Sequence, residues 1–215
     1  MAINQPEPGA RLNDGPVAPA RPSATVILLR GGERELEVLL VQRTPKASFM
    51  GGAWVFPGGS VDPADGEGEA GLRGAARREL AEETGIALPD HSELVPFARW
   101  ITPEAVSKRF DTWFFLAAAP VGAEARVDGS EIVDARWLTP AAALDQQTQG
   151  ELFLVFPTIK QLQQLSQFAG AQALLEHARS HEVHPVKPVI VGSGETARIL
   201  LPGDPGYEAI RTPRR

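Results

Sequence analysis

The sequence predicts an α+β fold built around a mixed β-sheet, and two observations support this prediction. Short apolar runs rich in β-branched residues, which are typical of strands, stand on both sides of one long helical pattern. Strands and helices therefore do not alternate as they do in a parallel βαβ protein. The chain has 215 residues, 43% of them hydrophobic, which is enough to bury the core of one domain.

In chain order, the first segment is an arm and the next ones are strands. Residues 1–22 combine several prolines and glycines without sustained periodicity, so we expect a flexible N-terminal arm. The apolar runs 24–30 and 36–43 are separated by "GGERE", which predicts an antiparallel pair joined by a turn. The segment "AWVFPGG" (53–59) predicts a short strand that ends at Pro-Gly-Gly. Further strands are expected over 94–101, 111–119 and 132–138.

Helices are expected mainly in the second half of the chain. The tail from residue 183 onward contains prolines, glycines and short apolar pieces, and it predicts a hairpin or a segment that wraps the domain. We find no internal repeat, so we expect one domain over 23–215, with a C-terminal helical extension from about residue 147. Helical patterns cover 69–84, 140–146, 157–168 and 171–180.

The composition excludes several classes of function. A net charge of -6 argues against a nucleic-acid partner, which needs a basic surface to neutralise phosphates. The absence of cysteine excludes disulfides and thiolate metal sites. No apolar run approaches the ~20 residues of a spanning helix, and the N-terminus lacks the apolar core of a signal peptide. We therefore expect a cytoplasmic protein without a membrane partner.

The segment "ARRELAEETG" (76–85) gathers Glu79, Glu82 and Glu83 within five positions. At about 100° per residue, a helix places the three carboxylates on one side. A solvated charged face is the usual explanation for such a pattern. Here Leu72 and Leu80 share or border that side, which indicates that the glutamates face the protein.

Carboxylates that face an apolar wall need cations. Arg78 can pair with Glu82 at the i, i+4 spacing, but one arginine cannot neutralise three acids. Oxygen ligands without cysteine favour Mg²⁺ or Mn²⁺ over zinc. Such ions assist the attack of water at phosphorus, so the helix predicts metal-dependent phosphoanhydride hydrolysis. Gly85 is expected to end the helix in the left-handed conformation.

This segment resembles the second half of the Nudix hydrolase signature. The resemblance covers about residues 24–145 and implies a mixed sheet sandwiched between helices, to which this chain adds C-terminal helices. The first half departs from the signature, because 60–77 carries an insertion of about five residues, which costs little loop entropy. Ala70 stands where the signature has its first glutamate, and Glu67 or Glu69 is a candidate for that structural role. The matching residues are Arg78, Glu79, Leu80, Glu82, Glu83, Gly85 and Ile86.

The resemblance also implies roles for individual residues. Glu79, Glu82 and Glu83 would bind the catalytic metals together with the carbonyl of Gly58, and Glu79 is also a candidate proton acceptor. Arg78 would orient the glutamates. Glu131 is a candidate for the additional glutamate that members often use, with a surface turn residue as the alternative.

Several segments resemble the coenzyme A diphosphatase branch of the family, including its peroxisomal type. They are "FPGGSVDPAD", "WITPEAVSKRFDTWFF", "ELFLVFPTIKQLQQL" and "LLPGDPGY". The favoured substrate is therefore coenzyme A or an acyl-coenzyme A. The segment before FPGG departs from that branch, since it lacks a histidine and a Gly-Gln pair and only Arg43 and the glycines have counterparts. The candidate substrate-binding residues are Arg43, Gly59, Lys108 and Arg109.

Other interpretations stay open at this point. Lys46 is a candidate contact for a 3'-phosphate, with an exposed lysine as the alternative. Tryptophans and Phe114 are candidates for stacking on an adenine or lining an acyl pocket, although aromatic residues in strands usually belong to the core. His177 and His181 have an i, i+4 spacing that fits a metal, but a surface pair is more common.

The competing functions are ADP-ribose or dinucleotide cleavage and a non-catalytic Nudix module that senses a nucleotide. The dinucleotide element "SQPWPFP" is absent, and intact glutamates argue against a sensor. In every case the expected partner is a small nucleotide diphosphate. The sequence does not predict an oligomeric state, and a homodimer is one option.

Overall fold

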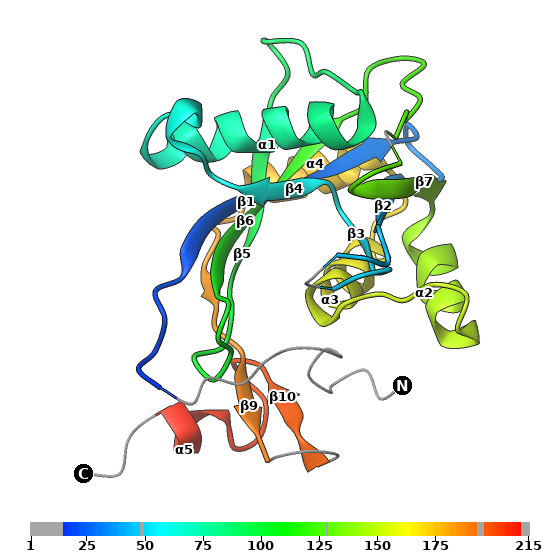
Figure 1. The fold of residues 1–215 in the computed structure, drawn as a ribbon. Helices are drawn as coiled ribbons and strands as arrows, with labels where there is room; N and C mark the ends of the chain where they lie inside the picture. The colour runs from blue at the N-terminus through cyan, green and yellow to red at the C-terminus, as the bar shows by residue number, and fades with distance from the viewer. Residues whose placement is uncertain (1–14, 48–49, 128, 193–195, 212–215) are drawn as a thin grey trace.

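The computed structural model describes residues 15–47, 50–127, 129–192 and 196–211 (Figure 1). The strands are β1 (Arg21–Arg30), β2 (Glu37–Arg43), β3 (Trp54–Val55), β4 (Gly58–Ser60), β5 (Val95–Ile101), β6 (Phe110–Ala118), β7 (Ile132–Leu138), β8 (Pro185–Val186), β9 (Val189–Val191) and β10 (Arg198–Leu200). The helices are α1 (Gly68–Thr84), α2 (Pro140–Gln149), α3 (Phe156–Leu165), α4 (Ala171–Arg179) and α5 (Tyr207–Arg211), with a short 3-10 helix η1 (Pro63–Asp65).

Over these residues the strands form one mixed sheet and one small hairpin. The large sheet has eight strands, with the neighbours β3-β2-β1-β6-β5-β8, while β4 pairs with β1 and β7 pairs with β2. The hairpin of β9 and β10 lies at the end of the molecule opposite α1 (Figure 1). The predicted α+β class is confirmed.

The central strand β1 has two edges that pair differently. One edge pairs in parallel with β6 along 21–29. The other edge pairs with β2 at Leu29 and Arg30 and with β4 at 23–25. The strands β1 and β2 therefore pair at the end of β1 and separate toward its start, where β4 pairs with β1 instead.

Alternate residues of β1 face opposite helical layers. Ala24, Val26 and Leu28 are fully buried and belong to the core cluster of α1. Ile27 and Leu29 belong to the core cluster that contains residues of α2, α3 and α4. The sheet is thus sandwiched between helices, with α1 covering one face (Figure 1).

Two expected boundaries are wrong. Arg21 and Pro22, which their composition placed in the arm, begin β1 and pair with β6. Gly58 and Gly59, expected to end a strand, form β4 with Ser60. Glycine has little intrinsic preference for strands, so only the pairing with β1 makes this segment a strand. Residues 1–14 of the expected arm lie outside the described residues.

The C-terminal segment contains the expected hairpin and attaches to the sheet. β8 pairs in parallel with β5, and the hairpin follows directly. Tyr207 of α5 is fully buried and its hydroxyl donates to the carbonyl of Lys187 at 2.7 Å. Among the described residues, no helix is long and apolar enough to span a membrane.

Candidate active site

Helix α1 presents two of the three glutamates to the protein. Ala75, Ala76 and Leu80 are fully buried against the sheet, which fixes the rotation of the helix. Gly85 ends the helix with φ 69° and donates its N–H to the carbonyl of Ala81 at 2.9 Å, as predicted.

The three glutamates differ in exposure. The Glu79 side chain is 18% exposed, whereas the Glu82 side chain is 60% exposed. Glu83 is half-buried and accepts a hydrogen bond from the backbone N–H of Gly58 at 3.0 Å. Two carboxylates therefore face the protein, and Glu82 lies at the edge of this group.

The Gly-Gly pair in β4 lets the backbone approach these carboxylates. A Cβ at Gly59 would overlap the Glu79 carboxylate, and one at Gly58 would lie 2.6 Å from the Cα of Thr25. The flanking hydrogen bonds from Val26 N–H to Pro57 and from Val61 N–H to Pro22 make Gly58 a non-hydrogen-bonded position of the ladder. Both the N–H and the carbonyl of Gly58 thus point away from β1.

Burial shifts the pKa of both inward carboxylates upward. Desolvation raises the pKa of Glu83 to about 7, and the negative charge of the neighbouring Glu79 contributes in the same direction. The hydrogen bond from Gly58 lowers this pKa but does not offset the desolvation. Desolvation also raises the pKa of Glu79, although Arg78 acts in the opposite direction. Negative charge in this place is therefore costly until a cation stabilises it.

Arg78 organises the acidic groups around it. Its Nε and Nη2 donate to the two carboxylate oxygens of Asp65, both at 2.9 Å. Its Nη1 donates to Glu79 at 2.9 Å and to Glu82 at 3.0 Å, and Nη2 also reaches the carbonyl of Ser60 at 3.1 Å. These bonds, above all those to Asp65, hold the pKa of Arg78 above its ordinary value. The expected pairing of Arg78 with Glu82 is confirmed.

Asp65 is a site residue that the sequence interpretation missed. Its side chain is 5% exposed, and the hydrogen bonds from Arg78 lower its pKa. The two acids considered for this structural role lie elsewhere: Glu67 is exposed, and Glu69 pairs with Arg73 at 2.7 Å. Asp65 lies in η1 within the insertion, where the family signature has no corresponding position, so the signature could not identify it.

The inward carboxylates line a cavity of about 450 Å³. Near the carboxylates its wall is polar, and it includes most of the residues expected to contact substrate. Glu82, Arg109 and Lys46 are not part of the wall. The expected residues that do line it are Arg43, Gly58, Gly59, Glu79, Glu83, Lys108 and Glu131.

The cavity wall includes two cations. The Nε of Arg43 is buried without a hydrogen-bond partner among the described residues, and the charge of Arg43 lowers the pKa of Glu83. Lys108 is exposed, and its Nζ lies 5.4 Å from the centre of the Phe110 ring. Arg43 is therefore close enough to the carboxylates to act electrostatically on them.

The placement of Arg109 does not support the substrate role expected for it. Its guanidinium donates to the backbone carbonyls of Thr102 at 3.1 Å and Ala18 at 2.6 Å. It holds the segment before β1 against the end of β5. Sequence proximity to Lys108 gave no information on this, since Lys108 lines the cavity and Arg109 does not.

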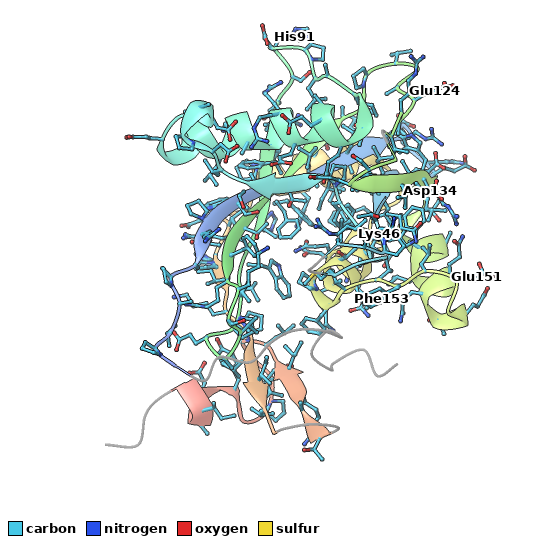
Figure 2. The ribbon with its side chains drawn as sticks, viewed as in Figure 1. Lys46, His91, Glu124, Asp134, Glu151 and Phe153 are labelled. Carbon is cyan, nitrogen blue, oxygen red and sulfur yellow. The ribbon has the colours of Figure 1, made fainter. Side chains whose placement is uncertain are left out.

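Some of the aromatic candidates line the cavity, whereas the histidine pair does not. Trp100 and Phe114 are buried core residues that also line the cavity, whereas Trp113 packs with Phe115 in the cluster beneath α1. His177 and His181 stack with ring centroids 3.8 Å apart outside the cavity wall. His91 lies at the tip of the loop beyond α1 (Figure 2).

The oxygen atoms around the carboxylates are of the chemical type that binds a hard divalent cation. Carboxylate oxygens and a peptide carbonyl are the ligands that Mg²⁺ and Mn²⁺ prefer. In the part of the chain that the structure describes, no three acidic or histidine side chains converge closely enough for a preformed metal site. Glu79 and Glu82 are instead turned toward Arg78.

Comparisons with known proteins identify the family of this chain. A model of the NUDIX domain matches residues 19–156. "Putative nudix hydrolase 7" of Caenorhabditis elegans is 30% identical over 183 residues, which cover 68% of this chain and 61% of that protein. "Acyl-coenzyme A diphosphatase NUDT19" of Homo sapiens is 27% identical over 124 residues, which cover 55% of this chain and 33% of that protein. The matched part of the chain thus spans less than two thirds of either relative.

The fold is also found among solved structures. The crystal structure of a NUDIX hydrolase from Alicyclobacillus acidocaldarius superposes with a TM-score of 0.66 at 27% identity. The match covers 74% of this chain and 96% of that one. The C-terminal hairpin lies beyond the residues that the family model matches.

Proposed function

This chain belongs to the NUDIX domain family, and on that premise we propose that it is a metal-dependent hydrolase of nucleoside diphosphates linked to another group. One observation carries the proposal. Two carboxylates of α1, both with raised pKa values, line one cavity beside the Gly-Gly strand. A divalent cation would stabilise this arrangement of charge, and a diphosphate is a ligand that shares such a cation.

Glu79, Glu82 and Glu83, with the carbonyl of Gly58, would hold Mg²⁺ or Mn²⁺. When bound, such an ion lowers the pKa of water and neutralises charge on the phosphates. Glu82 would have to leave Arg78 to take part, which its exposure permits.

The side chains around the carboxylates supply the remaining functions. Glu79 is the candidate proton acceptor for the attacking water, because its raised pKa makes it a better base than an exposed glutamate. Arg78, fixed by Asp65, limits the orientations of Glu79. Arg43 and Lys108, which line the cavity, would donate to phosphate oxygens. Glu131 is exposed at the cavity wall and is a second candidate for metal or proton binding.

We favour coenzyme A or an acyl-coenzyme A as the substrate. The names of the human and Xenopus laevis relatives describe acyl-coenzyme A diphosphatases, and the Xenopus protein is 22% identical over 80% of this chain. Besides its polar residues, the cavity wall includes Trp100, Phe114 and Phe156 of one hydrophobic cluster. A substrate that joins a diphosphate to an apolar group would use both kinds of residue.

Hydrolysis assays test this function directly. The purified chain is incubated with coenzyme A, acyl-coenzyme A, ADP-ribose, NADH and diadenosine polyphosphates, each with Mg²⁺ or Mn²⁺. Glu79→Gln and Glu83→Gln should lower kcat by on the order of 10²–10⁴-fold, the usual effect of removing a proton-transfer group or an equivalent charge. Glu69→Gln is the matched control, because Glu69 lies on the same helix with its side chain 72% exposed.

The possible results separate the candidate functions. Faster cleavage of ADP-ribose or NADH than of coenzyme A would replace the favoured substrate while keeping the hydrolase. Binding of a nucleotide without turnover under any metal would favour the sensing module instead. Equal activity of Glu79→Gln, Glu83→Gln and the wild type would contradict the proposed site.

A further inference from the structure

Part of the cavity wall is contributed by a segment that lies outside the family domain. Pro188, Ile190 and Ile199 belong to the cavity wall. They lie on or beside β9 and β10, beyond the matched residues 19–156. The matched domain alone would therefore lack this part of the wall.

Three attachments hold the hairpin in this place. β8, just before it, pairs with β5, so that Val186 lies opposite Trp100 of the cavity wall. The hydroxyl of Tyr207, a fully buried residue, donates to the carbonyl of Lys187 at 2.7 Å. Ile199 is only 6% exposed and belongs to the main core cluster. The hairpin is thus a fixed wall of the cavity.

The cavity wall combines two kinds of side chain. The carboxylates, Arg43 and the glycines of β4 form a polar part. The hairpin residues Ile190 and Ile199 belong to one hydrophobic cluster with Trp100 and Phe156 of the wall. Lys108 also lines the wall, beside Phe110. A ligand that fills such a cavity has a charged end and a hydrocarbon end.

We propose that the C-terminal hairpin closes an aliphatic subsite, in which Ile190 and Ile199 contact an unbranched hydrocarbon chain of the substrate and limit the length that is accepted. The inference rests on the proposed function for the position of the diphosphate. It assigns specificity to residues that lie outside the matched domain. Ile190 is partly buried and Ile199 nearly fully buried, so both side chains shape the wall from the inside.

Equilibrium binding tests this subsite without requiring hydrolysis. The affinities for coenzyme A and its acetyl, butyryl, hexanoyl, octanoyl and decanoyl thioesters are measured by calorimetry in EDTA. The wild-type affinity should rise about fourfold for each methylene that is buried and then stop rising at a limiting chain length. Ile190→Ala and Ile199→Val should move that limit to a longer chain, and Ile190→Phe should move it to a shorter one.

Ile210→Ala is the matched control, since Ile210 lies in α5 of the same extension, is 49% exposed and is not part of the cavity wall. It should leave the chain-length profile unchanged. Ile199→Val is included because it removes one methyl group and disturbs folding less than alanine does. Circular dichroism shows whether each variant is folded.

An affinity that does not depend on chain length would overturn the subsite, as would a limiting length that is the same in the wild type and all Ile190 and Ile199 variants. Hydrolysis of coenzyme A and ADP-ribose with Mg²⁺ is measured separately. If neither is cleaved, nor any other diphosphate of the panel above with Mg²⁺ or Mn²⁺, the proposed hydrolase is refuted, while the binding series still decides whether the hairpin forms an aliphatic subsite.

Discussion

Glu83→Gln should stabilise the metal-free protein, and the gain should grow with pH. The amide oxygen of glutamine can still accept the hydrogen bond from Gly58, but the buried charge is lost. The pKa of Glu83 is about 7 in the folded chain against an ordinary value of 4.5. Between these values the unfolded chain loses the proton while the folded chain keeps it, so the stability of the wild type falls as pH rises through this window.

The size of the effect follows from the shift. Each pKa unit corresponds to 1.36 kcal/mol, so ionised Glu83 costs the folded wild type roughly 3 kcal/mol above pH 7. From about pH 5 to about pH 8, the advantage of Glu83→Gln should grow by roughly 2–3 kcal/mol. For a chain of this length, that corresponds to a melting-temperature difference on the order of 5–10 °C.

Thermal unfolding in EDTA, followed by circular dichroism across this pH range, measures the difference. Glu69→Gln is again the control and should give a difference that is independent of pH. Addition of Mg²⁺ above pH 7 should stabilise the wild type, by about 2.7 kcal/mol at a hundred times its Kd, and should stabilise Glu83→Gln much less. A Glu83→Gln protein that is less stable than the wild type at pH 8 would refute the argument that this carboxylate is strained by burial.

Three further predictions concern the neighbours of the glutamates. Asp65→Asn should lower kcat by roughly 10–100-fold with a small change in KM, because it weakens the hydrogen bonds that fix Arg78 and leaves the cavity wall unchanged. Steady-state kinetics measure both constants, and an unchanged kcat would contradict the positioning role of Asp65. Gly59→Ala should lower activity strongly and the melting temperature only slightly, since the atoms nearest to the added methyl group belong to the end of the Glu79 side chain and not to the backbone. A large fall in melting temperature with unchanged activity would contradict this. Arg43→Lys should raise KM for diphosphates by roughly tenfold, because a lysine replaces the fork of a guanidinium, whereas an unchanged KM would exclude a phosphate contact.

The glutamate-rich helical pattern was the part of the sequence that predicted the structure best. The glutamate helix and its end at Gly85 follow from helical periodicity and a single conformational requirement, and both are confirmed. The signature resemblance is confirmed by the match over residues 19–156. These features depend on residues close together in the chain.

Contacts between distant segments were not predictable in the same way. Asp65 reaches Arg78 only because the inserted loop folds back along α1, and sequence spacing instead pointed to Glu67 and Glu69. The hairpin was expected, but nothing in "PVIV" or "ARILL" indicated that it would line the cavity. Arg109 was assigned by its neighbourhood in sequence, and its partner Ala18 lies far away along the chain.

The parallel pairing of β1 with β6 has a consequence for synthesis on the ribosome. Arg21 pairs with Phe110, so β2, β3, β4, α1 and β5 are all made before the longest ladder of the sheet can form. Until then one long edge of an apolar strand stays without its final partner, a state that promotes aggregation and slows folding. Expression at low temperature or with a chaperone that shields nascent strands should therefore raise the soluble yield more than changes at the cavity would.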